Sequence, residues 1–275
     1  MNIQENQLFK NYLANLNTHV SITGHTTVSR DWRDIEYSPQ YYKFYFIQGG
    51  EGWIRIGDKE YYPKPGQLVL MPCGVIQSYS VISENTYTKY WCHFNAKVGD
   101  MNLFELLNVP YILDVKDSLY LESLFAALDE SFNSNELCSP LEIQVYMLRL
   151  LAFFISNCPP DELYLIKRDS MEKLNDVLLY IDSNYRNVIS VDELARIAHL
   201  HPNYFIRLFR KHIGESPIHY LNKKRIDEAK KLLTCTNLTL KEISEKIGLS
   251  DVYYLSRVFK EYTGFSPSTY KQMLK

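Results

Sequence analysis

The C-terminal part of the chain contains an internal repeat, and this feature restricts the fold more than any other. When residues 207–220 are aligned with residues 257–270, six positions are identical. The matched pairs are Arg207/Arg257, Phe209/Phe259, Gly214/Gly264, Ser216/Ser266, Pro217/Pro267 and Tyr220/Tyr270. Further upstream the register changes by one residue and pairs Ser190 with Thr239. A repeat of this length indicates one supersecondary unit that is present twice.

Each copy carries the signals that start and stop short helices. Ser190-x-x-Glu193 and Thr239-x-x-Glu242 have the pattern of capping boxes. Gly214 and Gly264 stand where a left-handed residue ends a helix. Two short helices joined by a tight turn form a helix-turn-helix unit. We therefore expect two such units, at residues 190–212 and 239–262, joined by a long helix over residues 218–233.

The second helix of each unit would lie in the major groove of DNA. Apolar residues at helical spacing turn one face inward and leave the opposite face outside. The outside residues are Asn203, Ile206, Arg207 and Arg210 in the first copy, and Val252, Tyr253, Ser256, Arg257 and Lys260 in the second. Arginine can donate two hydrogen bonds to guanine, asparagine can pair with adenine, and an aliphatic side chain can touch the thymine methyl group. The alternative is that this face is only solvated.

The charge distribution supports a nucleic-acid partner. Residues 1–170 contain 13 Lys and Arg against 20 Asp and Glu, whereas residues 171–275 contain 17 against 12. A basic unit attached to an acidic body is typical of DNA-binding proteins. Neither a long apolar run nor a signal sequence is evident, and the five cysteines are scattered, so we expect a cytoplasmic protein with no membrane partner.

The N-terminal half has a different pattern. Short aromatic and β-branched runs between Tyr41 and Phe94 alternate with Gly and Pro turns, which predicts an antiparallel barrel or sandwich. Helical periodicity follows over residues 119–132 and again after Pro140. We expect an α+β multidomain chain: a cupin-like or jelly-roll-like β-barrel (1–114), a helical dimerisation segment (115–158), a linker (159–169) and an all-α DNA-binding domain (170–275).

The helix after Pro140 is apolar on two faces. One stripe is Leu141, Val145, Leu148, Ala152 and Ile155, and the other runs from Ile143 to Phe154. One stripe is enough for packing on the barrel, so the second predicts a partner, most simply the same helix in a homodimer. A helix enclosed within its own domain is the alternative.

The C-terminal region resembles the AraC/XylS family of bacterial transcription regulators. The resemblance rests on Arg-x-Phe-[Lys/Arg] at 207–210 and 257–260, on Gly-x-Ser-Pro-x-x-Tyr after each, and on Arg225 in the connecting helix. It implies that DNA bases are read by Asn203, Ile206, Arg207, Val252, Tyr253, Ser256 and Arg257. We expect phosphate contacts from Arg210, Lys224, Arg225 and Lys260. The sequence 251–255 departs from the frequent family pattern Asp-Pro-Ser-Tyr-Phe.

The N-terminal half resembles the cupin-type sensor of the arabinose-regulator branch of that family. The matching motifs are Ile47-x-x-Gly50-x-Gly52, residues 64–67 and Tyr90-Trp91-x-His93-Phe94. The resemblance implies a small effector, often a sugar, with Tyr79 and Trp91 in the pocket and Arg30 or Arg33 as polar anchor. The implied function is a ligand-responsive, sequence-specific regulator, and RNA polymerase is a candidate partner. No cofactor and no enzymatic activity are expected.

Two other functions compete with this one. A metal-dependent cupin enzyme needs a His-x-His pair on the first strands and a later histidine, but residues 44–56 contain no histidine. We therefore expect neither a metal nor catalytic residues. A DNA-binding regulator without a sugar effector is the second alternative, with a barrel that binds a protein or senses oxidation through Cys73 and Cys92. These cysteines can equally be small buried apolar residues.

Overall fold

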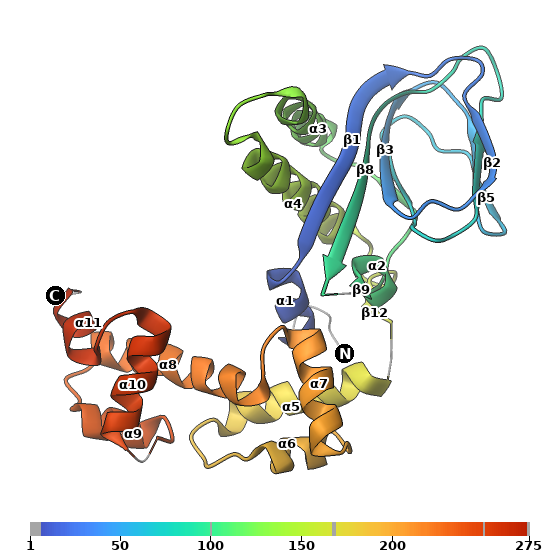
Figure 1. Ribbon diagram of the computed structural model, residues 1–275. Helices are drawn as coiled ribbons and strands as arrows, with labels where there is room; N and C mark the ends of the chain where they lie inside the picture. The colour runs from blue at the N-terminus through green and yellow to red at the C-terminus, as the bar shows by residue number, and fades with distance from the viewer. Residues whose placement is uncertain (1–6, 100, 167–168, 250, 274–275) are drawn as a thin grey trace. The chain divides into compact units, whose positions relative to one another are not determined.

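The computed structural model describes residues 7–99, 101–166, 169–249 and 251–273 (Figure 1). Contacts between residues divide the chain into two compact units. One unit spans residues 16–166 and contains the strands. The other combines the described residues of 1–15 with those after 167 and is helical.

The first unit is built from two antiparallel sheets, as the sequence predicted. The larger sheet has the order β1 (Asn17–Thr27), β8 (Thr88–Val98), β3 (Tyr42–Gly49), β6 (Gln67–Met71) and β11 (Ile112–Asp114), with β9 (Met101–Asn102) on β8. The smaller sheet has the order β2 (Arg33–Tyr37), β7 (Gln77–Ser80), β4 (Trp53–Ile56) and β5 (Lys59–Tyr61). A short pair joins β10 (Leu107–Asn108) to β12 (Tyr164–Leu165).

The larger sheet has an apolar core on each face, because successive side chains of a strand point to opposite faces. On β3, Phe44 and Phe46 join the core that includes Phe125 and Phe154 of the helices. Tyr45 and Ile47 join a second core that contains residues from both sheets. One face is therefore covered by helices, and the other faces the smaller sheet.

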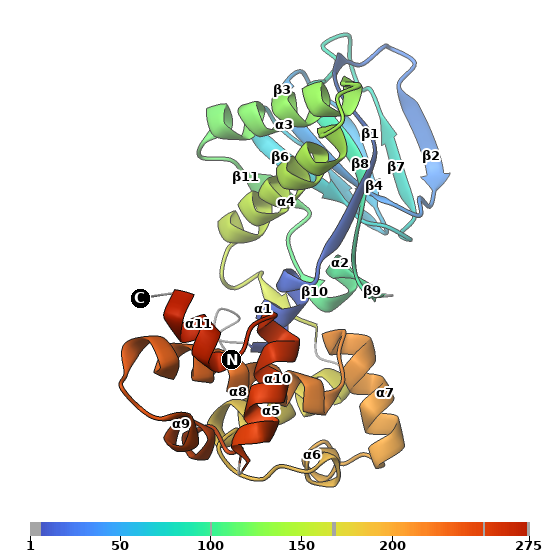
Figure 2. The ribbon, with the colours of Figure 1, turned by 60° about the vertical axis from the view of Figure 1, so that its left-hand side comes forward.

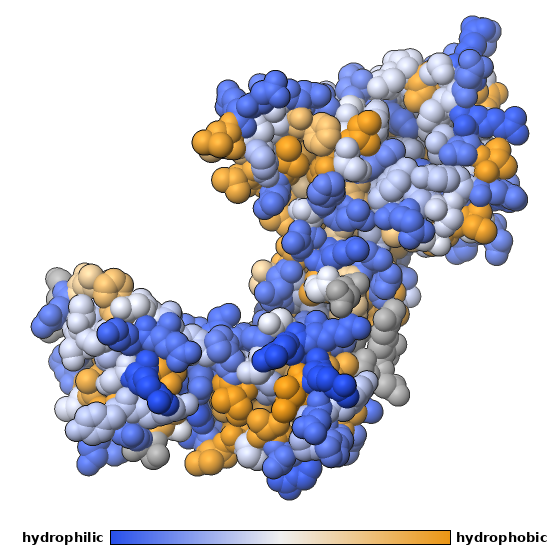
Figure 3. All heavy atoms as spheres, in the orientation of Figure 1, coloured by the Kyte–Doolittle hydropathy of each residue, from blue (hydrophilic) through white to orange (hydrophobic). Residues whose placement is uncertain are grey.

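The covering helices are α3 (Ser118–Asn133) and α4 (Ser139–Asn157), which lie on the larger sheet beside each other (Figure 2). The short α2 (Leu103–Leu106) precedes them. Met147, Leu150 and Phe154 of α4 are buried in the core. The other stripe remains at the surface of this unit, with Leu141, Val145 and Leu148 exposed, and apolar atoms gather over these helices in Figure 3. Within the described ranges, α4 is long and apolar enough to cross a bilayer, but here one face belongs to the core of the sheet unit.

The helical unit contains both predicted helix-turn-helix pairs. Its elements are α1 (Gln7–Ala14), α5 (Asp169–Asn184), α6 (Val191–Ile197), α7 (Pro202–Ile213), α8 (Pro217–Cys235), α9 (Leu240–Lys246), α10 (Val252–Thr263) and α11 (Pro267–Met273). Gly214 and Gly264 are left-handed C-caps, with φ of 87° and 78°. Thr239 and Glu242 form the expected capping box. At Ser190 only half of the box is present, because the Glu193 carboxylate accepts a hydrogen bond from the Tyr180 hydroxyl instead.

The position of the first helix differs from the expected domain 1–114. Helix α1 packs against α5 and α7 in the helical unit. Leu8, Phe9 and Tyr12 are buried, and the Tyr12 hydroxyl lies 2.7 Å from Nδ1 of His212. These three residues form an apolar stripe that helix α1 alone cannot bury. The expected linker 159–169 also differs, since β12 lies within it and pairs with β10, while residues 167–168 are outside the described residues.

Candidate DNA-binding surface and effector site

Helices α7 and α10 each bury one face and present the other. Phe205 and Phe209 are buried on α7, and Leu255 and Phe259 are buried on α10. Of the side chains predicted to face DNA, Asn203, Arg207, Arg210, Tyr253, Arg257 and Lys260 are exposed, and Ile206, Val252 and Ser256 are half-buried. The inward and outward faces are therefore those that the spacing of apolar residues indicated.

Arg207 and Arg257 occupy matching places on the two helices. The Arg257 guanidinium lies over the ring of Tyr254, 5.2 Å from its centroid. Among the described residues, neither arginine is held by a hydrogen bond or an ion pair of its guanidinium. Both guanidinium groups therefore keep their donors available for an external acceptor.

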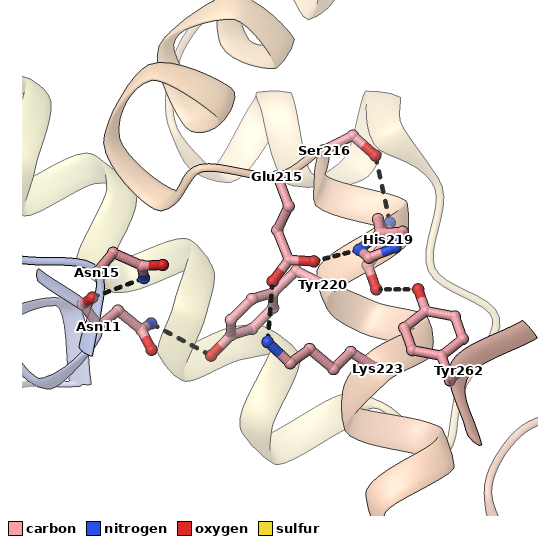
Figure 4. Close-up of polar contacts among 8 residues, drawn as sticks. All are labelled: Asn11, Asn15, Glu215, Ser216, His219, Tyr220, Lys223 and Tyr262. Carbon is pink, nitrogen blue, oxygen red and sulfur yellow. Dashed lines mark hydrogen bonds and ion pairs between the residues drawn. The ribbon is translucent and has the colours of Figure 1, made fainter. Parts of the chain in front are cut away.

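Helix α8 joins the two helix-turn-helix pairs, and Figure 4 shows polar contacts around the start of this helix. The Ser216 hydroxyl accepts a hydrogen bond from the amide of His219 and caps the helix. The Tyr262 hydroxyl, from the end of α10, donates to the His219 carbonyl at 2.9 Å. The Glu215 carboxylate pairs with the His219 ring and lies 3.7 Å from Nζ of Lys223. The Tyr262 contact ties the end of the second recognition helix to the first turn of α8, and the other contacts hold that turn.

The structure corrects the expectation for Arg225. Its side chain is only 7% exposed, and its guanidinium donates to the carbonyl oxygens of Tyr185 at 2.8 Å and of Asn187 at 2.7 Å. Burial lowers its pKa, although the group remains charged. Arg225 therefore ties α8 to the loop between α5 and α6 and is not placed to contact a phosphate.

The other predicted phosphate contacts remain near the surface. Arg210 and Lys260 are exposed at the ends of α7 and α10. Lys224 is half-buried, and its Nζ pairs with Asp182 at 2.7 Å. A phosphate contact by Lys224 would therefore compete with an existing ion pair.

A group of aromatic side chains lies between the two sheets of the first unit. Trp32 stacks on Tyr79, with centroids 4.4 Å apart, and packs edge-on against Tyr45. Trp91 belongs to the same core, and its Nε1 donates to the Thr26 hydroxyl at 3.4 Å. The structure thus brings the predicted Tyr79 and Trp91 to the same core between the sheets.

Two lysines, which the sequence reasoning missed, lie on this face. Lys89 Nζ is 3.4 Å from the ring centroid of Tyr45 and 4.0 Å from that of Trp32. Lys43 Nζ is 5.1 Å from the centroids of Tyr37 and Tyr79. Burial lowers the pKa of Lys43 to about 8 and that of Lys89 well below its usual value. The sequence signal that could have indicated this cluster is a lysine inside the otherwise apolar run 42–47.

The structure does not bring the predicted polar anchors to this cluster. Arg30 lies in the turn before β2 and pairs with Glu84 on the surface at 2.9 Å. Arg33 is exposed opposite Ser80, whereas the next pair, Asp34 and Tyr79, points to the other face of the smaller sheet. The period of two in a strand therefore places Arg33 away from Tyr79, and the expectation for both arginines is corrected.

Comparison with known families gives one match for each unit. Residues 19–151 match the model of an AraC-like ligand binding domain. Residues 194–273 match the model of a helix-turn-helix domain, which covers both pairs of helices. The chain belongs to the AraC/XylS family of transcription regulators.

This AraC/XylS regulator is similar to several characterised members along most of its length. It is 25% identical to the raffinose operon transcriptional regulatory protein RafR of Pediococcus pentosaceus, over 85% of each chain. It is 25% identical to the lactose operon transcription activator of Staphylococcus xylosus, over 82% of each chain. It is 28% identical to the arabinose operon regulatory protein of Escherichia coli, over 81% of this chain and 77% of the relative.

Two features of the sheet unit concern metal binding and thiol chemistry. In the described part of the chain, no three His, Cys, Asp or Glu side chains are grouped as metal ligands. Cys92 is fully buried, and burial raises the pKa of its thiol to about 12. Burial also raises the pKa of Cys73. Reactive cysteines have lowered pKa values, so both thiols have the character of inert apolar residues.

Proposed function

We propose that the protein is a ligand-responsive regulator that binds operator DNA through α7 and α10 and controls genes of carbohydrate uptake or metabolism. The observation that carries the proposal is the pair of exposed arginines, Arg207 and Arg257, at matching positions of two recognition helices. A sequence repeat that preserves the caps, the buried faces and these arginines supports a common task for both helices. In this function the protein is not an enzyme and works in the cytoplasm.

Bases are read by two sets of side chains in this proposal. On α7 they are Asn203, Ile206 and Arg207. On α10 they are Val252, Tyr253, Ser256 and Arg257. Each arginine recognises guanine, which is worth about 1–3 kcal/mol of discrimination. Arg210 and Lys260 contact phosphates and set the register on the duplex, and Lys224 contributes where its pairing with Asp182 permits.

The effector binds in the N-terminal sheet unit, between the two sheets. Flat aromatic side chains such as Trp32, Tyr79 and Trp91 can stack on the C–H faces of a sugar ring, which supports a carbohydrate effector. Similar proteins are named as regulators of raffinose, lactose and arabinose operons, which supports the same class. Effector binding changes DNA affinity by favouring one state of the chain.

The proposed assembly is a homodimer formed through α4. Four members of the predicted stripe, Leu141, Val145, Leu148 and Ala152, are exposed on α4, whereas Ile155 is half-buried and packs against the core of the sheet unit. Two chains would then place four helix-turn-helix units on two half-sites. The relative from Staphylococcus xylosus is named an activator, and we propose the same sign of regulation here, with RNA polymerase as the protein partner.

A selection of binding sites from random duplex DNA tests the DNA-binding part. The full-length protein should enrich a motif of two short blocks. Arg207→Ala should relax the preference at one base pair and Arg257→Ala at another, each by about tenfold. Arg210→Ala is the matched control and should weaken all sequences equally. If Arg207→Ala weakened binding to all sequences equally, Arg207 would be a phosphate contact. That result would refute base reading by this residue.

A thermal-shift screen against sugars tests the effector part. A ligand that binds only the folded state raises the melting temperature by mass action. The same ligand must change the affinity of the protein for the selected DNA, because the coupling between two sites is reciprocal. A ligand that binds without changing DNA affinity would contradict regulation by this effector.

A further inference from the structure

Lys43 and Lys89 project from the same face of the larger sheet. Lys43 is on β3 and Lys89 is on β8, the neighbouring strand, where Lys43 pairs with His93 and Lys89 pairs with Ile47. Positions 43 and 47, like 89 and 93, differ by four residues, so their side chains share a face. Tyr45, between them, belongs to the core that faces the smaller sheet. Both ammonium groups are therefore directed between the two sheets.

Both lysines are buried, and the described residues provide no ion pair for either. Lys43 is 1% exposed and Lys89 is 3% exposed. In the described residues, Nζ of neither lysine makes a hydrogen bond or an ion pair, and the groups around each Nζ are aromatic rings. A cation held over an aromatic ring is stabilised only modestly. Removal of an ion from water costs more free energy than such contacts supply, so the rings alone do not offset the cost.

Basic groups outnumber acidic groups on this face. The other titratable groups in contact with the lysines and their rings are tyrosines, His93 and Asp34. Burial and the two lysines lower the pKa of His93 to about 4, so its ring is neutral at pH 7. Asp34, half-buried opposite Tyr79, is the single carboxylate among these groups. Two basic groups thus face one acid, and an occupant with a negative charge would favour the protonated form of both lysines.

We propose that the effector, in the function proposed above, is a sugar-sized anion whose carboxylate or phosphate lies between Nζ of Lys43 and Nζ of Lys89. The sugar ring then stacks against the aromatic side chains of Trp32, Tyr79 and Trp91. A neutral sugar of the same shape would supply no negative charge to either lysine. The site therefore selects sugar acids or sugar phosphates over the parent sugars.

The lysines are also predicted to take up protons when the anion binds. Burial lowers the pKa of both groups, and a nearby negative charge raises the pKa of an ammonium. Binding of the acid should therefore draw protons from the buffer. A neutral sugar has no such effect.

The test uses the full-length protein and matched ligand series. Glucose is compared with glucuronate and glucose 6-phosphate, and galactose with galacturonate and galactose 6-phosphate, with acetate and inorganic phosphate as bare anions. Melting temperatures identify the ligand, and calorimetry in imidazole and Tris buffers measures affinity and proton uptake. The expected result is binding of one acid or one phosphate, at least tenfold tighter than its parent sugar. Binding of the sugar acid would identify a carboxylate site, and binding of the sugar phosphate would identify a phosphate site.

Lys43→Met and Lys89→Met are the decisive variants, and Lys59→Met is the control on the exposed strand β5. Methionine has a similar length and no charge to desolvate, so both variants should fold with melting temperatures equal to or above that of the wild type. Each should lose at least tenfold in affinity for the acid together with proton uptake, whereas Lys59→Met should lose neither.

Three outcomes would overturn the inference. A neutral sugar that binds wild type and both methionine variants equally well would refute the anion and leave the proposed sugar response intact. An acid whose affinity and proton uptake survive in both variants would place the anion elsewhere. If no ligand of the panel binds, both this inference and the sugar effector are refuted. The selection of DNA sites would still test base reading separately.

Discussion

His199 and Gly248 are matched residues in the two helix-turn-helix turns, and both have a left-handed backbone, with φ of 52° and 77°. The turn geometry therefore demands a positive φ in each copy, although only the second copy has glycine there. A Cβ atom added to Gly248 would lie 2.3 Å from the carbonyl oxygen of Arg186. The same loop supplies the Tyr185 and Asn187 carbonyls that bind Arg225. The second turn and α8 thus hold the segment 185–187 from two sides.

This relationship predicts opposite effects of two substitutions. His199→Gly should stabilise the helical unit by roughly 0.5–1 kcal/mol, because relief of left-handed strain exceeds the entropy that glycine adds to the unfolded chain. Gly248→Ala should destabilise it by more than about 1 kcal/mol, since the strain and the clash with Arg186 act together. Thermal melting followed by far-ultraviolet circular dichroism measures both. Equal destabilisation by the two changes would contradict a shared left-handed requirement.

Arg225 should prove to be a structural residue. Arg225→Met leaves two carbonyl oxygens without their donors and should cost about 2–4 kcal/mol, because hydrogen bonds to a charged group are strong. Arg225→Lys should recover little, since an ammonium cannot reproduce the two-pronged contact. At a temperature where the variant is folded, the slope of log affinity against log salt should equal that of the wild type. Arg210→Ala is the control and should reduce that slope by about one. A reduced slope in Arg225→Met would instead show that Arg225 contacts a phosphate.

Features encoded by neighbouring residues were predictable from the sequence. The caps at Ser190 and Thr239 and the left-handed Gly214 and Gly264 depend on a few adjacent residues, so their patterns located the helices of both units. The apolar spacing likewise separated the buried from the exposed face of α4. These features need no knowledge of distant contacts.

Features that depend on distant contacts were not predictable. Arg225 looks like a surface cation until the carbonyls of residues 185 and 187 are placed beside it. Arg30 and Arg33 matched a family expectation, but the register of β2 against β7 turns Arg33 outward. The significance of Lys43 and Lys89 appears only when pairing of β3 with β8 brings them to one face.

His93 should make the sheet unit sensitive to mild acid. Its pKa in the folded protein is about 4, against about 6.5 when unfolded, so the unfolded chain binds the extra proton between these values. Stability is therefore lost as the pH falls from 6.5 towards 4, by about 1–2 kcal/mol at pH 5. His93→Gln should reduce the difference in unfolding free energy between pH 7 and pH 5 by that amount. An unchanged difference would mean that the His93 ring is already hydrated in the folded state.

The exposed stripe of α4 should control assembly. Leu148 lies near the middle of the helix and is exposed, whereas Met147 and Leu150 are buried, so Leu148→Glu adds a charge without disturbing the core of the sheet unit. If two chains meet through this stripe, a buried unpaired carboxylate costs several kcal/mol and the dimer dissociates. Sedimentation equilibrium should then show a monomer. Thermal melting should give an unchanged melting temperature for the DNA-binding unit. Glu130→Gln, on the exposed part of α3, is the control and should leave the mass unchanged.

The monomer should still bind a single half-site through Arg207 and Arg257 but lose the added affinity of two linked half-sites, which is about 10²–10⁴-fold for bivalent binders. A Leu148→Glu protein that keeps its mass would show that another surface forms the dimer or that the protein is a monomer.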